Sequence, residues 1–240
     1  VTAGAGASDI QGRLTSNGQV FLLNPDGVFF GRNAQVNVGG LVASTLYLSD
    51  TDFSNSNFRF ENRGSTGAVI NQGEMNARQG GYIALLAPEV RNEGVITAQL
   101  GTVAMAAGDR VTLDFAGDQL VNLSVDKASL NASVENRHAI VADGGMVVLA
   151  AKTASDLAST VVNNSGIIQA QSVGIKNGVI RLEGGSQLSG AGTANSPVGA
   201  GDAIPSSIGD TAVSSVGAGN TPSNGITVVS GTLDVLGRRS

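Results

Sequence analysis

Short apolar runs separated by tight turns fill the first part of the chain. Two of them, Val20–Leu23 and Val28–Phe30, are separated only by Asn24-Pro25-Asp26-Gly27. This tetrapeptide has the residues that a type I turn favours, with Asn first, Pro second to preset φ, Asp third and Gly fourth. Two further β-rich runs, Ala34–Val38 and Leu41–Ser44, are separated by a Gly-Gly pair. The pattern predicts strand, corner, strand, and then a second β-rich segment.

Two short phrases recur later in the chain. The first is Asn-x-Gly, usually followed by β-branched residues, and it begins at Asn62, Asn71, Asn92 and Asn164. The second is Gly-x-Ile/Val-x-Leu/Met-x-Ala, which begins at Gly81, Gly101 and Gly145, with a weaker copy at Gly178. The interval from Asn71 to Asn92 is almost the same as that from Gly81 to Gly101, and the interval from Gly101 to Gly145 is about twice as long. We interpret the last interval as two periods of the same repeat.

A period of about 20 residues, built from short strands and Gly or Asn corners, is typical of a β-solenoid. Three strands of about five residues and their turns fit one such period. The sequence therefore predicts an all-β fold, a right-handed parallel β-helix with short extra-helical strands or hairpins. Asn residues at equivalent corners are expected to stack and hydrogen-bond, unless they are merely tolerated turn residues. No helix is predicted, apart from weak helical spacing around Ala151–Val161.

Composition supports many short strands and narrows the class of function. The 240 residues include 34 Gly, no Cys and no Trp, and 41% of them are apolar. Gly and Asn supply the positive-φ corners of a chain that turns often. A net charge of −5 argues against a nucleic-acid partner, because phosphates attract a basic surface. No apolar run approaches the length of a membrane span, which is about 18 residues or more, so no membrane-spanning segment is predicted.

The chain divides into three parts that differ in residue composition and strand pattern. Residues 1–184 carry the strand pattern and are predicted to form the β-helix domain. Residues 185–224 are rich in Gly, Ala, Ser and Pro and are predicted to be a loop or linker. Residues 225–240 resume the strand pattern and are expected to be a truncated further strand. The chain begins at Val1 without Met, so we expect a removed leader or, preferably, a longer parent protein whose amino-terminal cap is missing here.

Candidate catalytic chemistry is sparse. His138 is the only histidine, so Ser-His-Asp and multi-histidine metal sites cannot be built, and it is interpreted as a turn or rung residue. Asp109, Asp114 and Asp118 are the carboxylates nearest a glycosidase arrangement, which needs two facing carboxyl groups. Asp109 and Asp114 are expected to point to opposite faces of a strand, so solvated turn carboxylates are the preferred interpretation. We expect no catalytic residue, metal or cofactor.

Three Asn-x-Ser sequons are candidate glycosylation sites. They begin at Asn122, Asn131 and Asn163. In a chain rich in Asn and Ser, chance alone produces several such triplets.

The residues between Ile10 and Ala107 closely resemble a known family. The segments that carry the resemblance are SNGQVFLLNPDGVFFG, NVGGLVASTL, NQG, GGYIALLAPEVRNEGVITA and GTVAMAAGD. They are similar to the amino-terminal two-partner-secretion (TPS) domain of exoproteins in the filamentous haemagglutinin and high-molecular-weight adhesin group. In that family an Asn-Pro-Asn-Gly turn lies between such strands, and here Asp26 stands in place of the second Asn. A second family motif, of the Asn-Pro-Asn-Leu type, does not occur in this sequence.

The resemblance implies a secreted adhesin module without enzymatic activity. In the family, such chains cross the periplasm of a Gram-negative bacterium and leave through an outer-membrane β-barrel transporter of the TpsB type. The transporter's periplasmic docking domains recognise this amino-terminal region. Asn24, Pro25, Asp26 and Gly27 fall on the motif needed for export. Some adhesins of the family are glycosylated, and the sequence does not identify a host-cell, matrix or carbohydrate receptor.

Two other functions remain open at this point. The chain is alternatively the export module of a contact-dependent toxin or of a haem- or haemopexin-scavenging exoprotein. A polysaccharide-active enzyme on the same fold is the third possibility. We also hypothesise that the Asn24–Gly27 corner sets the register of the first rungs, since a solenoid folds rung by rung from nearest-neighbour contacts. Replacing Asn24 and Pro25 by Ala is then expected to reduce secretion while the purified domain keeps its β-structure.

Overall fold

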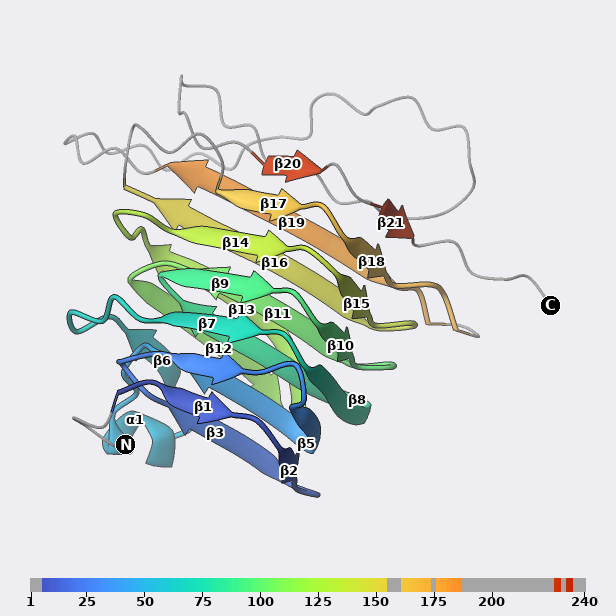
Figure 1. Cartoon of the computed structure of the whole chain (residues 1–240), viewed down its shortest axis with the longest axis horizontal. Helices are drawn as coiled ribbons and strands as arrows, with labels where there is room; N and C mark the ends of the chain where they lie inside the picture. The colour runs from blue at the N-terminus through green and yellow to red at the C-terminus, as the bar shows by residue number, and fades with distance from the viewer. Residues whose placement is uncertain (1–5, 155–160, 174–175, 187–226, 230–231, 235–240) are drawn as a thin grey trace.

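The computed structural model describes residues 6–154, 161–173, 176–186, 227–229 and 232–234. In these residues the chain winds as a right-handed coil of parallel strands from one end of the molecule to the other (Figure 1). The strands stack in three columns, which we call the front, side and back columns. The predicted parallel β-helix is confirmed.

The front column is a seven-stranded parallel sheet. Its strands, in stacking order, are β1 (Ser8–Ile10), β4 (Val28–Phe30), β7 (Ala68–Asn71), β9 (Glu89–Asn92), β14 (Ser133–Asn136), β17 (Val162–Asn164) and β20 (Thr227–Val229).

The side and back columns belong to one 11-stranded sheet, because β5 (Gln35–Ser44) and β8 (Glu74–Ala87) run through both. Besides these two strands, the side column contains β2 (Arg13–Thr15), β10 (Val95–Thr97), β15 (Ala139–Val141), β18 (Ile167–Gln169) and β21 (Thr232–Asp234). The back column contains β3 (Gln19–Leu23), β11 (Thr102–Ala107), β16 (Met146–Thr153) and β19 (Val179–Ser186).

We call one turn of the coil a rung. The predicted period matches some of the intervals between neighbouring rungs, but not all of them. In the front column Ser8 pairs with Val28 and Val69 pairs with Val90, and both intervals are close to the predicted period. Thr102 pairs directly with Met146, so the long interval from Gly101 to Gly145 spans one rung and not two. The extra length leaves the coil as a hairpin after β11. The interpretation of that interval as two periods is therefore wrong.

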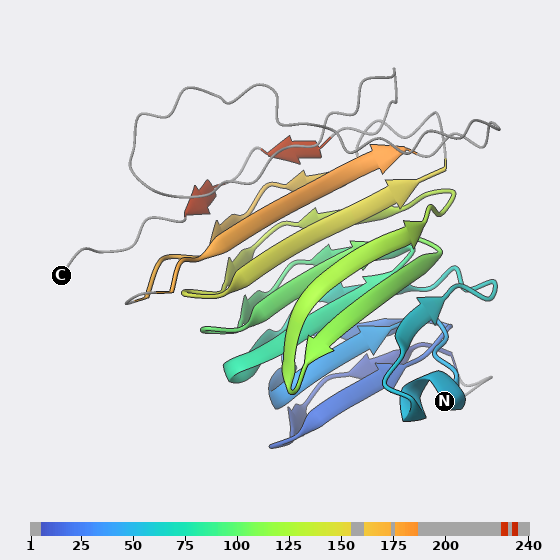
Figure 2. The same ribbon diagram turned by 180° about the vertical axis from the view of Figure 1, so that it is seen from behind.

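A small antiparallel sheet covers the outer surface of the back column. It consists of β6 (Phe58–Glu61), β12 (Arg110–Ala116) and β13 (Gln119–Lys127), in the order β13-β12-β6. Seen from behind, the β12–β13 hairpin lies across the back column, with β6 and helix α1 (Asp50–Ser54) beside it (Figure 2). These elements are the extra-helical strands that the fold prediction included.

Two apolar layers result, one on each side of the back column. The inner core runs along the coil axis and includes Val90, Ile96 and Met105, all fully buried. The outer layer places Val42, Tyr82 and other back-column residues against the extra-helical sheet. Since both faces of these strands are buried, they read as continuous apolar runs such as Ile83–Ala87. This explains the second repeated phrase of the sequence.

A ladder of buried asparagines follows the corner between the front and side columns. Asn71 donates through Nδ2 to Oδ1 of Asn92 at 2.9 Å, Asn92 donates to Asn136 at 2.8 Å, and Asn136 donates to Asn164 at 2.7 Å. All four side chains are buried. The predicted Asn stacking is therefore present, with Asn136 as a member that the Asn-x-Gly phrase did not include. Asn62 is not a member; its Nδ2 donates to Asp109 in the extra-helical region.

One helix expectation needs correction, and the other lies mostly outside the described residues. The described residues include one short helix, α1, where none was predicted. The Ser49 hydroxyl caps it by accepting from the Asp52 amide at 3.0 Å, and its hydrogen bond to the Asp52 carboxylate holds the pKa of that group below its usual value. The weak helical spacing around Ala151–Val161 begins in β16, which ends at Thr153, and residues 155–160 lie outside the described residues.

Candidate functional site

The Asn24-Pro25-Asp26-Gly27 tetrapeptide forms the corner that joins β3 to β4. The Gly27 amide donates to the Asn24 carbonyl oxygen at 3.1 Å, which closes a four-residue turn. The Asp26 amide donates to Asn24 Oδ1 at 3.0 Å. Gly27 has φ of +127°, a conformation that other residues rarely adopt. The corner is therefore a turn of the kind that the sequence predicts.

The Asn24 side chain ties this corner to the first rung. Its Nδ2 donates to the Gly6 carbonyl oxygen at 3.0 Å and to Ser8 Oγ at 2.9 Å. Its backbone amide donates to the Ser44 carbonyl oxygen of the next rung at 2.9 Å. The residue is only 1% exposed. Asn24 thus holds two rungs together from inside, where a partner protein has no access to it.

The chain segment between β6 and β7 packs directly on the corner. Ser65 Oγ donates to the Pro25 carbonyl oxygen at 2.6 Å. A Cβ atom added to Gly67 would lie 2.7 Å from both that oxygen and the Gly27 amide nitrogen, so only glycine fits at position 67. The corner is therefore held in place by the Ser65 hydroxyl and by the close backbone approach at Gly67.

The outer side of the corner is accessible. Pro25 and Asp26 are both exposed. Beside them lies a recess of about 150 Å³ with mostly apolar walls. The Arg63 guanidinium stands at one wall, 3.6 Å above the centre of the Tyr47 ring. We call Pro25, Asp26 and this recess the corner surface; the recess is lined by Leu23, Pro25, Thr45, Leu46, Tyr47, Leu48, Arg63 and Ser65.

A comparison with protein-family models assigns residues 1–196 to the TPS secretion domain. This match spans most of the chain. The chain belongs to the TPS secretion domain family. Proteins with this domain are two-partner-secretion exoproteins of Gram-negative bacteria, as the sequence resemblance implied.

Curated relatives of this TPS domain come from Haemophilus influenzae and are named heme/hemopexin-binding protein. One is 33% identical over 187 residues and another is 30% identical over 203 residues, in each case over 75% of this chain. The chain spans about a fifth of the length of these relatives. Among solved structures, the HMW1 secretion domain from Haemophilus influenzae matches with a TM-score of 0.59 and 24% identity, covering 94% of this chain and 66% of the other. That similarity supports the assignment of a β-helix fold to this chain.

The three sequons of this TPS domain lie in different surroundings. Asn131 is exposed in the connection between β13 and β14. Asn122 lies on β13, half-buried, and donates to Asp114 Oδ2 at 3.1 Å. Asn163 lies on β17, half-buried, and its Oδ1 has no hydrogen-bond partner among the described residues. Only Asn131 combines an exposed side chain with a turn, so glycosylation stays a prediction that this site fits best.

The candidate carboxylates separate into two places. Asp109 accepts from Asn62 at 3.0 Å and lies 3.5 Å from Lys127 Nζ. Asp114 and Asp118 instead line one recess at the end of the β12–β13 hairpin. In the part of the chain that the structure describes, no group of three His, Cys, Asp or Glu side chains is arranged to hold a metal ion.

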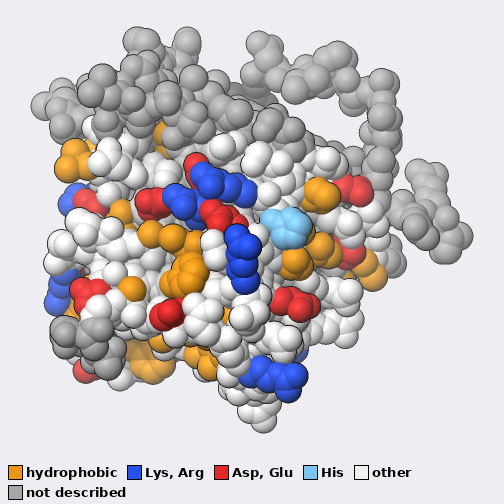
Figure 3. Space-filling view, viewed as in Figure 1, with side chains coloured by type: hydrophobic (Ala, Val, Ile, Leu, Met, Phe, Trp, Pro, Cys, Tyr) orange, Lys and Arg blue, Asp and Glu red, His pale blue; other side chains and the backbone are white. Residues whose placement is uncertain are grey.

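Charged side chains gather on the front face of the domain, where Figure 3 shows them with the single histidine beside them. Arg91 lies 3.3 Å from Glu135, and Arg137 lies 2.7 Å from Glu135 and 3.2 Å from Glu93. His138 is exposed at the corner between β14 and β15. That placement agrees with its interpretation as a turn residue. The cluster pairs opposite charges across rungs, which stabilises the stack modestly.

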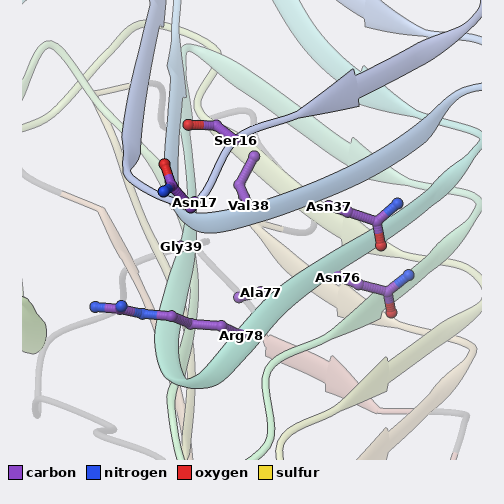
Figure 4. A pocket seen from close by; sticks show the side chains of 8 residues that line it. All are labelled: Ser16, Asn17, Asn37, Val38, Gly39, Asn76, Ala77 and Arg78. Atoms are coloured by element: carbon purple, nitrogen blue, oxygen red, sulfur yellow. The ribbon is translucent and has the colours of Figure 1, made fainter.

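A shallow groove of about 420 Å³ lies at the corner between the side and back columns. Figure 4 shows Asn37 and Asn76 pointing the same way from neighbouring strands, with Arg78 directed to the opposite side. Arg78 is engaged there with Asp118 at 3.2 Å. Across the described ranges, no helix has the length and apolar character of a membrane span.

Proposed function

We propose that this TPS domain is the export module of a secreted exoprotein of the haem- or haemopexin-scavenging kind. The names of the Haemophilus influenzae relatives support this choice over an adhesin. Those relatives align over only about a fifth of their length, and in this proposal the binding of haem or hemopexin is assigned to the parent protein outside this domain. The domain itself carries no catalytic role in this proposal.

The partner in this proposal is an outer-membrane β-barrel transporter of the TpsB type. Its periplasmic docking domains recognise the corner surface as the chain passes from the periplasm to the cell surface. The observation that carries this assignment is the division of the corner into two sides. Asn24 is buried and bonded within the domain, whereas Pro25 and Asp26 face outward beside a recess of a size to take one side chain.

Substitutions of two exposed carboxylates, one at the corner and one away from it, test the assignment. Asp26→Lys reverses an exposed charge without removing a buried contact, so the purified domain keeps its melting temperature while secretion with the cognate transporter falls at least about tenfold. Asp9→Lys, an exposed carboxylate on β1, is the matched control and leaves secretion unchanged. Normal export of Asp26→Lys contradicts recognition at this corner.

The scavenging activity is tested on the parent protein and on this domain in parallel. Haem is titrated and its absorption band is recorded, and hemopexin is titrated in a calorimeter. Both titrations are expected to show binding to the parent exoprotein only. A parent protein that binds neither but attaches to host cells instead supports an adhesin. Binding of either ligand to the isolated domain with the same affinity contradicts its role as a pure export module.

A further inference from the structure

A second recess lies on the opposite side of the molecule from the charged front face. It is bounded by the first rung at Gln19, by residues 56–58 before and within β6, and by residues 112–118 at the end of the β12–β13 hairpin. Its volume is about 500 Å³. We call it the hairpin recess. Three segments far apart in the sequence therefore build one concave surface.

Aromatic side chains concentrate at this recess. The chain has only seven Phe and two Tyr residues, and five of these nine form one contact chain. Phe58 and Phe115 line the recess and meet edge to face at a centroid distance of 4.8 Å. Phe21 stacks on Phe58 at a centroid distance of 5.6 Å, and Tyr82 packs on Phe115 at 5.0 Å. The two lining rings are thus held in place by other rings.

The remaining lining is mostly polar, and none of the described residues in it is basic. Hydroxyl, amide and carboxylate side chains come from Gln19, Ser56, Asn57, Thr112, Asp114 and Asp118. Asp118 is already engaged by Gln19 at 3.1 Å and by Arg78 at 3.2 Å. These contacts fix the hairpin end against the coil. Donors and acceptors are mixed, and the Asp114 carboxylate, which no cation pairs among the described residues, repels an anionic ligand.

We propose that the hairpin recess binds an uncharged saccharide. A pyranose ring has one face of C–H groups, which packs on Phe58 or Phe115, since the two rings meet at 71° and do not form one flat platform. It also has a rim of hydroxyls, each both donor and acceptor. The rim matches the amides and carboxylates around the rings. A cationic peptide suits the recess less well, because Asp118 already has Arg78 as its cation. The recess is separate from the corner surface and independent of export.

The test is titration of the isotope-labelled domain with lactose and with 3′-sialyllactose, followed by amide chemical shifts. Lactose is expected to bind in the millimolar range and to shift the amides of residues 56–58 and 112–118. The sialylated sugar adds a carboxylate and is expected to bind more weakly. Phe115→Leu keeps an apolar side chain but loses the ring, so affinity falls about fivefold.

Phe29→Leu is the matched control, because Phe29 is half-buried on β4 of the front column, outside the aromatic chain, and does not line the recess. It is expected to leave the lactose affinity unchanged, and melting curves of both variants check that each is folded. Three outcomes overturn the proposal: no shift with either sugar, shifts at other residues, or equal losses in the two variants. Binding of trilysine at these amides without binding of lactose also overturns it, in favour of a cation site.

Discussion

At the scale of single residues, the buried asparagine ladder replaces hydrophobic packing at one corner of the coil. Asn92 and Asn136, in the middle of the ladder, each donate through the side-chain amide to the asparagine of the next rung. Each also accepts a hydrogen bond from the asparagine of the previous rung. Asn92 also accepts from the Gly94 amide at 3.2 Å. Buried amides without such partners would be destabilising, so the ladder both stabilises the rungs and fixes their register.

Asn92→Ala is expected to destabilise the domain by about 2–4 kcal/mol, because it leaves buried groups of two neighbouring asparagines and one backbone amide without their partner. Urea denaturation measures the change. The control is Asn37→Ala on β5, whose side chain is exposed and is expected to cost less than about 0.5 kcal/mol. Equal effects of the two substitutions contradict the structural role of the ladder.

Tyr82 gives a second prediction at this scale. Its side chain is 0% exposed, and its hydroxyl has no hydrogen-bond partner among the described residues. Burial, with a smaller contribution from the Asp118 charge, raises the pKa of Tyr82 well above its usual value of 10.0. Above pH 10 the unfolded chain loses this proton while the folded protein keeps it, so stability falls as pH rises.

Between about pH 8 and about pH 11, the native protein is expected to lose about 1.4 kcal/mol more stability than Tyr82→Phe, as measured by urea denaturation. At neutral pH the variant is expected to be as stable as the native protein or up to about 1 kcal/mol more stable, since it removes an unpaired buried hydroxyl. Parallel pH profiles for the two proteins exclude this explanation.

The sequence predicts three of the four ladder residues and misses one for a simple reason. Asn71, Asn92 and Asn164 are each followed by x-Gly, whereas Asn136 is followed by Arg137 and His138. The contact that explains the Gly39-Gly40 pair is also invisible in the sequence. A Cβ atom on Gly40 would lie 2.5 Å from the Tyr82 ring, a contact between rungs that only stacking creates.

At the scale of elements, the β12–β13 hairpin is the feature that the sequence predicts least well. Apolar and polar residues alternate along its two strands, as they do in strands of the coil. No local sequence feature therefore distinguishes a strand that stacks in the coil from one that leaves it. Pairing with β6, which lies far earlier in the chain, defines its place. The hairpin then covers rungs both before and after its own position in the chain, with Asp118 bonded back to the first rung.

Leu123→Ser is expected to destabilise the domain by about 2–4 kcal/mol and to increase binding of a hydrophobic dye, since Leu123 is 2% exposed against the back column. Val121→Ser lies on the same strand close to Leu123, where the side chain is 48% exposed. It is the control and is expected to change stability by less than about 0.5 kcal/mol. If both variants behave alike, the hairpin does not cover an apolar layer.

At the scale of the whole molecule, each rung contacts its neighbours, so stability accumulates along the coil. The Asn24 corner joins the first two rungs of the described coil. Family membership and fold followed from the sequence because the apolar repeats and the turn residues are local signals. The division of the corner into a buried side and an exposed side did not, because it depends on Ser65 and Gly67, which belong to the distant segment between β6 and β7.

The claim that most depends on this geometry is that the transporter recognises the exposed side of the Asn24–Gly27 corner. The direct measurement is site-specific photocrosslinking during export, with the reactive residue placed at Asp26 or, as the control, at Ile167, which is 51% exposed on the sixth rung. We predict a covalent adduct with the transporter's periplasmic domains from position 26 and none from position 167. An adduct from position 167 alone, or equal adducts from both, contradicts the account.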